Sequence, residues 1–181
     1  MIAPAHALTM LASKLEPGER VLYARRPDIG VTLRNKLVLW WIGVPWCIAI
    51  FGLYFAGRAS TTITVPFALV GLAIVIAPIL LAIDTQYTLY ALTDRRALIV
   101  HDWFRPQTVS CPFERMDEKP ELLTAGSKGG HLYFASGYSP RLRDVDYTGK
   151  LAFRDLADVP DAADALQRAR KERPLQHPQP S

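Results

Sequence analysis

Two long stretches without a charged residue constrain this chain more than any other feature. No charged residue occurs in Leu37–Gly57, and none occurs in Ala59–Ile83. A helix of about 21 residues is roughly 32 Å long, which is enough to cross the hydrocarbon core of a bilayer. The sequence therefore predicts two transmembrane helices, at 37–57 and 63–83. The alternative, a pair of core helices in a soluble protein, is disfavoured because both stretches are longer than about eighteen residues.

The link between these stretches is short, so they form a hairpin with both chain ends on one side. Residues 58–62 contain one basic residue, Arg58, whereas five lie in Arg20–Lys36, and Arg95 and Arg96 follow the second stretch. Basic residues are enriched on the cytoplasmic side of membrane proteins. The sequence thus predicts a multi-pass protein with both termini in the cytoplasm, a cytoplasmic segment at 1–36 and a short periplasmic loop at 58–62.

Within the predicted spans, aromatic residues lie where membrane interfaces are expected. Trp40 and Trp41 are predicted to anchor the inner interface, and Tyr54 the outer one. Neither span contains an ionisable Asp, Glu, Lys, Arg or His, which disfavours an ion or proton pathway. Gly52 and Ala56 form a small-xxx-small pair that is compatible with a homo-oligomer, although such pairs are common by chance in apolar segments.

The remaining segments offer little for nucleic-acid binding or catalysis. Residues 84–181 contain fourteen basic and fourteen acidic residues, without the basic excess typical of nucleic-acid-binding domains. The four histidines are scattered, and Cys47 and Cys111 belong to no CxxC pair. His101 precedes Asp102, but adjacent side chains on a strand point to opposite faces, so we interpret His101 as an exposed residue at a strand end. The sequence predicts no enzyme, no cofactor, no metal site and no nucleic-acid partner.

Residues 84–173 are predicted to form a small, mainly β domain that ends in a helix. Alternating apolar residues and turn signals place strands at 86–92, 97–100, 109–113, 131–135 and 150–156. Pro112 indicates an edge or a strand end. Asp158 is the expected N-cap of a helix with the apolar face Val159, Ala163, Leu166 and Ala169. Pro174 ends this helix, and residues 174–181 are expected to be disordered.

Several segments on both sides of the hairpin form a recognisable set. They are Pro17–Tyr23 and Arg25–Pro27 before it, Tyr87–Arg96 after it, and an Asp-rich helix start within Phe153–Leu166. This set resembles bacterial membrane proteins that carry a pleckstrin-homology (PH)-like domain. The resemblance implies a curved, seven-stranded antiparallel sheet capped by the C-terminal helix, in the bacterial inner (plasma) membrane. It implies a role in binding proteins or assembling membrane complexes. It does not imply phosphoinositide binding, because no lipid-binding residues of the family can be matched here. Residues 116–147 match nothing in the family.

The segment before the hairpin and four arginines complete the prediction. Glu19–Arg25 alternates in a way that could add a strand to the sheet. The candidate contacts to lipid headgroups or to a partner are Arg25, Arg26, Arg95 and Arg96. Orientation of the hairpin, with the arginines snorkelling at the inner leaflet, is the simpler interpretation of these pairs.

A non-enzymatic, membrane-anchored interaction or scaffold module is the leading functional hypothesis. Such a module would bind other inner-membrane proteins or help to assemble them, through loops or an edge strand of the sheet. Its partners would be the lipid bilayer and another membrane protein. The alternative hypothesis is a sensor of anionic lipid headgroups at the inner leaflet.

Overall fold

The computed structural model describes residues 9, 11–103, 105–124 and 129–171. The chain divides into two compact units. The hairpin unit is Ile29–Thr85, and the β unit combines the segment up to Asp28 with the segment from Gln86 onward. The β unit is therefore built from two pieces of chain that are separated in sequence by the whole hairpin unit.

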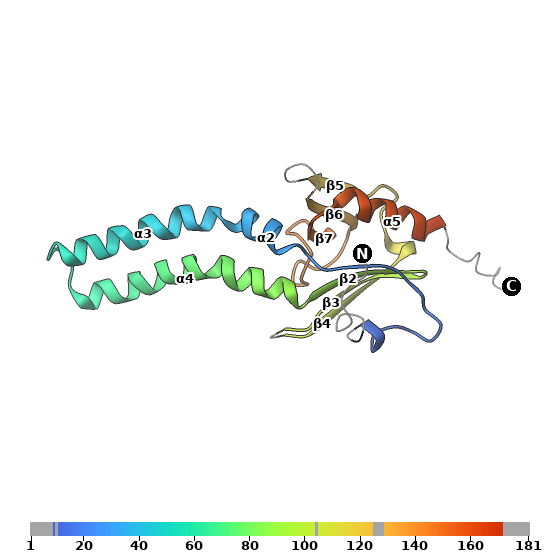
Figure 1. Cartoon of the computed structure of the whole chain (residues 1–181), viewed down its shortest axis with the longest axis horizontal. Helices are drawn as coiled ribbons and strands as arrows, with labels where there is room; N and C mark the ends of the chain where they lie inside the picture. Colours follow the sequence, from blue (N-terminus) through green and yellow to red (C-terminus); the bar gives the residue numbers. More distant parts are fainter. Residues whose placement is uncertain (1–8, 10, 104, 125–128, 172–181) are drawn as a thin grey trace. The chain divides into compact units, whose positions relative to one another are not determined.

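The β unit contains two antiparallel sheets and a C-terminal helix (Figure 1). The four-stranded sheet has the order β1-β2-β3-β4, with bounds Val21–Arg25, Thr88–Thr93, Arg96–His101 and Gln107–Pro112. The three-stranded sheet has the order β5-β6-β7, with bounds Glu121–Thr124, Gly130–Ala135 and Leu151–Leu156. A short 3-10 helix, η1 (Phe113–Arg115), follows β4, and α5 (Val159–Lys171) follows β7. The sequence suggested one curved sheet, whereas the structure has two.

The first strand of the β unit comes from the segment before the hairpin. β1 pairs antiparallel with β2, with Val21 opposite Thr93 and Arg25 opposite Tyr90. The alternation around Val21 and Tyr23 was the local signal for this strand. Because β1 and β2 are neighbours in the sheet, the hairpin unit is an insertion between two adjacent strands.

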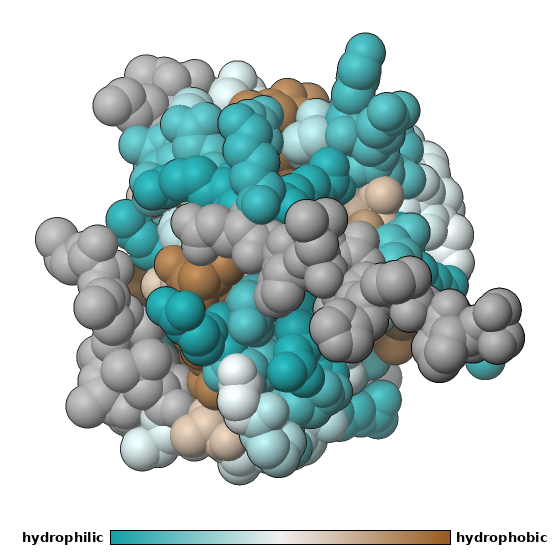
Figure 2. Space-filling model, turned by 90° about the vertical axis from the view of Figure 1, so that its right-hand side faces the viewer, coloured by the Kyte–Doolittle hydropathy of each residue, from teal (hydrophilic) through white to brown (hydrophobic). Residues whose placement is uncertain are grey.

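The main core of the β unit is shared by both sheets and α5. Phe153 of β7 stacks on Tyr90 of β2 with ring centroids 4.9 Å apart. The ring centroid of Phe134, in β6, lies 4.7 Å from that of Phe153. All three side chains are almost completely buried. The buried face of α5 consists of Val159, Ala162, Ala163, Ala165, Leu166 and Ala169, which confirms the predicted apolar face. The face of the β unit shown in Figure 2 is mainly hydrophilic, with small hydrophobic areas.

The four-stranded sheet is covered on its second face as well. A smaller cluster joins Leu89 and Ala91 of β2 to Leu98 and Val100 of β3, and Leu11 packs over it with 1% of its surface exposed. Every residue of β2 is consequently buried. The segment before β1 thus acts as a cover for the sheet, which explains why β2 and β3 read as nearly continuous apolar runs.

The local signals for α5 are confirmed. Asp158 Oδ1 accepts a hydrogen bond of 3.1 Å from the Asp161 N–H, as an N-cap residue should. The cap satisfies one of the N–H groups that a helix leaves unpaired at its start. Pro174 and the tail at 174–181 lie outside the described residues.

The hairpin unit contains α2 (Ile29–Lys36), α3 (Val38–Phe55) and α4 (Thr61–Gln86). Helices α3 and α4 are long and apolar enough to cross a membrane, which confirms the prediction of two such helices. Their bounds differ slightly from the expected 37–57 and 63–83, because α3 ends earlier and α4 extends at both ends. The helix α2 was not expected, since its sequence has no clear apolar face.

Glycines allow α3 and α4 to approach closely. A Cβ added to Gly71 would lie 2.6 Å from the Cys47 sulfur, and one added to Gly43 would lie 2.9 Å from Val75 Cγ2. An added Cβ at Gly52, by contrast, would meet nothing within 4 Å. The contact between the two helices therefore uses Gly43 and Gly71, and the small-xxx-small pair at Gly52 lies elsewhere on α3.

Several predicted strand bounds need correction. Gln86 belongs to α4, so the predicted strand at 86–92 begins at Thr88. Phe113 lies in η1 rather than in β4, because the chain turns after Pro112. Strand β5 was not expected at all, and it lies in the stretch 116–147, which matches nothing in the family.

Candidate functional site

The two arginine pairs lie at different ends of the four-stranded sheet. Arg25 is opposite Tyr90 and Arg26 follows it, whereas Arg95 lies in the turn between β2 and β3 and Arg96 is the first residue of β3. Tyr90 lies three positions before Thr93, the last residue of β2, which corresponds to about 10 Å along the strand. The structure does not bring the four predicted contact residues together into one basic patch.

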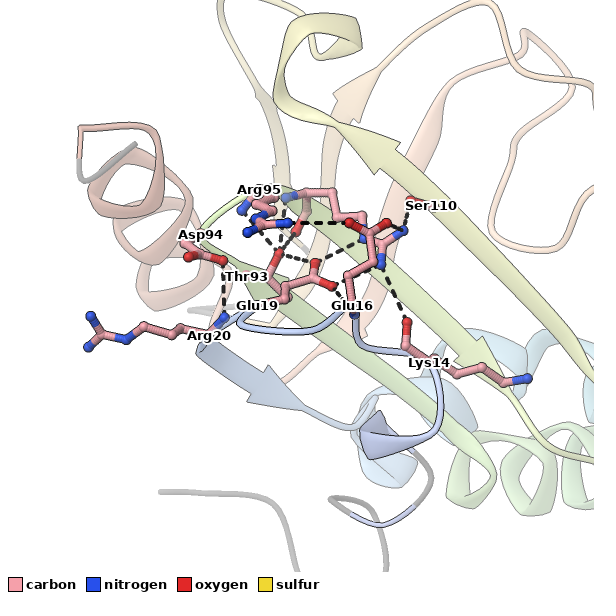
Figure 3. A network of polar contacts seen from close by, with 9 residues as sticks. Lys14, Glu16, Glu19, Arg20, Thr93, Asp94, Arg95 and Ser110 are labelled. Carbon is pink, nitrogen blue, oxygen red and sulfur yellow. Dashed lines mark hydrogen bonds and ion pairs between the residues drawn. The ribbon is translucent and has the colours of Figure 1, made fainter. Parts of the chain in front are cut away.

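Arg96 is held by the segment before β1. Its Nε and Nη2 donate to the two carboxylate oxygens of Glu19 at 2.9 and 2.8 Å, and its Nη1 lies 3.1 Å from Glu16 Oε1. Thr93 Oγ1 also donates to Glu19, at 2.8 Å. Figure 3 shows Glu16 and Glu19 of the N-terminal segment close to Thr93, at the end of β2. We call this group, Glu16, Glu19, Thr93 and Arg96, the N-terminal clasp.

Electrostatics within the clasp stabilise its charged form. Burial by itself would raise the pKa of Glu19, but the hydrogen bond from Arg96, together with those from a backbone N–H and from Thr93, lowers that pKa to about 2. The hydrogen bond to Glu19 likewise raises the pKa of Arg96. The Glu19 side chain has no exposed surface. Arg96 is thus a partner in a buried bidentate ion pair, a strong and geometrically specific interaction.

The other arginines are more exposed. Arg25 Nη2 lies 3.2 Å from Asp161 Oδ2, with the two side chains 37% and 41% exposed, so it links β1 to the first turn of α5. Arg95 Nη1 lies 3.4 Å from Glu16 Oε2 in a similarly exposed pair. Arg26 is half-buried. Exposed pairs of this kind contribute little to stability, so these side chains remain accessible to solvent or to a partner.

His101 corrects an expectation from the sequence. It is 5% exposed rather than an exposed strand-end residue. Its Nδ1 lies 2.8 Å from Thr88 Oγ1, and its Nε2 lies 2.6 Å from Asp144 Oδ2. Tyr90 donates to the other oxygen of Asp144 at 2.9 Å. This buried cluster fastens β2 and β3 to the loop before β7. No sequence signal could have found it, because Asp144 follows His101 by 43 residues.

Strand β5 is the most open edge of the β unit. Among the described residues it pairs with β6 alone, and all four of its residues are exposed. Leu122 is 47% exposed and Leu123 is 57% exposed. Glu121, the charged residue of the strand, is paired with Lys150 Nζ at 2.7 Å. The strand therefore presents two exposed leucines next to backbone groups at a sheet edge.

The opposite edge of the same sheet is covered. On β7, the Ala152 N–H donates to the Asp144 carbonyl at 3.0 Å, and the Asp155 carbonyl accepts from the Asp28 N–H at 2.7 Å. These bonds occupy backbone groups on the side of β7 away from β6. The three-stranded sheet thus has one edge satisfied by the rest of the β unit, and β5 as its open edge.

The predicted interfacial aromatics divide into two groups. Trp40 Nε1 donates to the Val75 carbonyl at 2.9 Å, so its N–H is engaged within the hairpin unit. Trp41 is 81% exposed and Tyr54 is 39% exposed. Trp40 itself is half-buried. Trp46 makes a second indole contact across the hairpin, donating to the Phe67 carbonyl at 3.0 Å.

Among the residues that the structure describes, no group of three His, Cys, Asp or Glu side chains could hold a metal ion. No family model, curated protein or solved structure matches this chain. Three features of the chain itself bear on its function: the exposed apolar helices, the two-piece β unit and the open β5 edge.

Proposed function

We propose that this protein is a membrane-anchored interaction module whose β unit binds an extended segment of another membrane protein. The open β5 edge carries the proposal. Extended peptides add to unpaired sheet edges through main-chain hydrogen bonds, and the exposed side chains of the edge provide specificity. Leu122 and Leu123 supply apolar contacts at this edge, which natural proteins usually protect when it has no partner.

The exposure of the hairpin unit supports membrane anchoring. In the membrane-length segments of α3 and α4, only 6% and 17% of the residues are buried. Large hydrophobic side chains such as Ile48 and Leu69 are 68% and 60% exposed. A soluble protein would hide such helices in its core, whereas lipid solvates them directly. The basic residues of Arg20–Lys36 favour an inner-membrane location with both termini in the cytoplasm.

The architecture of the β unit supports a PH-like fold. Two antiparallel sheets with four and three strands share a core with one C-terminal helix. Seven antiparallel strands followed by one helix agree with the layout that the resemblance implies, with two differences: the strands form two sheets, and the hairpin unit separates β1 from β2. Such a domain, tied to the membrane between its first two strands, is suited to a scaffold and requires no catalytic site.

Paired variants test the β5 edge. Leu122→Lys with Leu123→Lys places charge on the open edge, and Thr108→Lys places the same kind of charge on an exposed position of β4. Full-length chains would be captured from membranes in mild detergent. We expect a stoichiometric membrane-protein partner with the wild type and Thr108→Lys, and its loss with the β5 variant. The partner should also slow hydrogen exchange of the β5 amides. Equal capture by all three chains would refute the proposal.

A sensor of anionic headgroups is the second candidate, based on the exposed Arg25 and Arg95. It is less well supported, because Arg96 is held by Glu19 and the two pairs are not adjacent. Replacing Arg25, Arg26, Arg95 and Arg96 by Gln in the reconstituted full chain tests it. Lipid-specific binding that disappears in this variant, without any protein partner, would favour the sensor.

A further inference from the structure

An aromatic pair lies next to the point where the chain leaves α4. Tyr87 follows directly on Gln86, the last residue of that helix. The ring of Trp103, from the turn between β3 and β4, stacks on the Tyr87 ring with centroids 5.5 Å apart and planes at 15°. The Asp102 N–H donates to the Tyr87 carbonyl at 2.9 Å. The β3–β4 turn is therefore fixed to the first residue after the helix.

Chain connectivity sets the depth of this pair relative to a bilayer. The uncharged stretch of α4 ends at Ile83, and Asp84 follows it. Tyr87 lies four residues after Ile83, which is about 6 Å of helical rise. The headgroup region on each side of a bilayer is about 5 to 8 Å thick. If α4 spans a membrane, as the proposed function requires, Tyr87 lies within the headgroup layer whatever the orientation of the β unit.

We infer that Tyr87, Trp103 and Arg105 form an interfacial foot, with which the β unit rests on the phospholipid headgroup layer. Tyr and Trp favour this layer because they combine an apolar ring with a polar group. Tyr87 is 41% exposed, Trp103 is half-buried and Arg105 is exposed. The foot differs from the predicted anchors of α3, and two of its residues, Trp103 and Arg105, come from a turn that follows α4 by sixteen residues or more.

The charge of the foot indicates what kind of lipid surface it fits. Arg105 can contact a phosphate group, and exposed Asp102 in the same turn offsets its charge. A foot with balanced charge and two aromatic rings fits the interface of any phospholipid bilayer, without selecting anionic lipids. It would restrict the rotation of the β unit about the end of α4, and so restrict the directions in which the β5 edge can face.

Site-directed fluorescence in the full chain tests this inference. Cys47 and Cys111 are replaced by Ala, and an environment-sensitive NBD label is placed at Pro106→Cys, Arg95→Cys or Ile48→Cys in phosphatidylcholine vesicles. Pro106 is exposed beside the foot, and Arg95 lies at the opposite end of β2. A lipid with a nitroxide on its headgroup should quench the label at 106 at least threefold more than the label at 95. Equal quenching at 106 and 95 would overturn the inference.

Two further arms separate the possible failures. The label at position 48 reports whether the hairpin enters the bilayer. Without quenching there by a nitroxide in the acyl chain, the membrane anchoring itself is wrong. With quenching at 48, Trp103→Ser should reduce the signal at 106 by half or more, whereas an unchanged signal would show that tethering by α4 alone causes it. Replacing a fifth of the lipid by phosphatidylglycerol should change the signal at 106 less than twofold. A larger rise would show that this surface selects anionic lipids and would contradict a foot of balanced charge.

A second measurement does not depend on a disruptive variant. The tryptophan emission of the unlabelled chain minus that of Trp103→Phe isolates the emission of Trp103, since Phe preserves a ring at this position. Lipids brominated near the headgroup should quench this difference signal more strongly than lipids brominated near the chain ends. Absence of quenching by both lipids would refute contact between Trp103 and the bilayer.

Discussion

The β unit and the hairpin unit follow opposite packing rules. In the β unit the largest buried side chains are aromatic or branched, such as Tyr90, Phe134 and Phe153. In α3 and α4 the buried residues are small or weakly polar, among them Gly43, Gly71 and Ala82, while the large hydrophobic side chains are exposed. Water drives large apolar groups inward, whereas helices in lipid gain by close backbone approach at small residues. The contrast indicates that the two units are built for different solvents.

The largest effect is expected from a substitution that removes a core ring from the β unit. Phe153→Ala deletes a fully buried ring that contacts Tyr90 and Phe134. Truncations of this kind cost about 3–5 kcal/mol. The matched control is Ile48→Ala, at an α3 position that is 68% exposed. Hydrogen exchange of the β6 and β7 amides in detergent micelles should accelerate strongly for Phe153→Ala and stay unchanged for Ile48→Ala. A comparable acceleration of exchange in both variants would contradict the difference in packing between the two units.

The β unit also differs from the hairpin unit in containing a buried ion pair, between Glu19 and Arg96. The folded-state pKa of Glu19 is about 2, below its ordinary value of 4.5. Its stabilising contribution is therefore complete above about pH 4.5 and is lost as the pH falls toward 2. A shift of this size corresponds to about 3 kcal/mol.

Substitution of Glu19 measures this contribution. Glu19→Gln should lower the free energy of unfolding of the β unit by about 2–3 kcal/mol at pH 7 and remove most of the pH dependence below 4.5. Glu16→Gln, at a side chain that is 54% exposed, should cost less than about 1 kcal/mol. Denaturant titrations from pH 3 to pH 7 give both values. Parallel pH profiles for the wild type and Glu19→Gln would contradict the assignment.

The reverse experiment enlarges a small residue in the hairpin unit. Gly71→Ala would place a Cβ 2.6 Å from the Cys47 sulfur and 2.7 Å from Trp46 Cδ1. Overpacking of this kind costs about 1–3 kcal/mol. The matched variant Gly52→Ala meets nothing within 4 Å, so helix propensity makes it neutral or slightly stabilising. Unfolding by sodium dodecyl sulfate in mixed micelles, followed by tryptophan emission, should separate the two variants. Equal midpoints would remove Gly71 from the helix contact.

The smallest effect concerns the exposed pair Arg25–Asp161. Both side chains are more than a third exposed, so solvent screens their interaction. A double-mutant cycle with Arg25→Gln and Asp161→Asn should give a coupling energy below about 1 kcal/mol, decreasing in high salt. A coupling energy above 2 kcal/mol would show that this pair behaves like the buried clasp and would blur the distinction between surface and interior.

Local patterns in the sequence determined much of this fold. The absence of charge over more than twenty residues predicted the two long helices, and the alternation of residues predicted parts of β2, β3, β4, β6 and β7. Asp158 and the apolar stripe that follows it predicted α5. Each of these signals acts over a few turns or strand residues, where backbone geometry fixes which side chains share a face. Strand β5 was not predicted, because its four residues are all exposed and show no alternation between buried and exposed positions.

Only the tertiary structure decided which distant groups meet. Glu19 and Arg96 are 77 residues apart, with the hairpin unit between them, and His101 and Asp144 are 43 apart. Pairing Tyr87 with Trp103, and leaving β5 open while β7 is covered, likewise depends on sheet register and on loop paths. These contacts form after chain closure over long loops, and composition or spacing along the sequence carries no information about their geometry. Residue types determined where each unit is apolar, and the packing of the sheets determined which surfaces of the β unit remain open to contact.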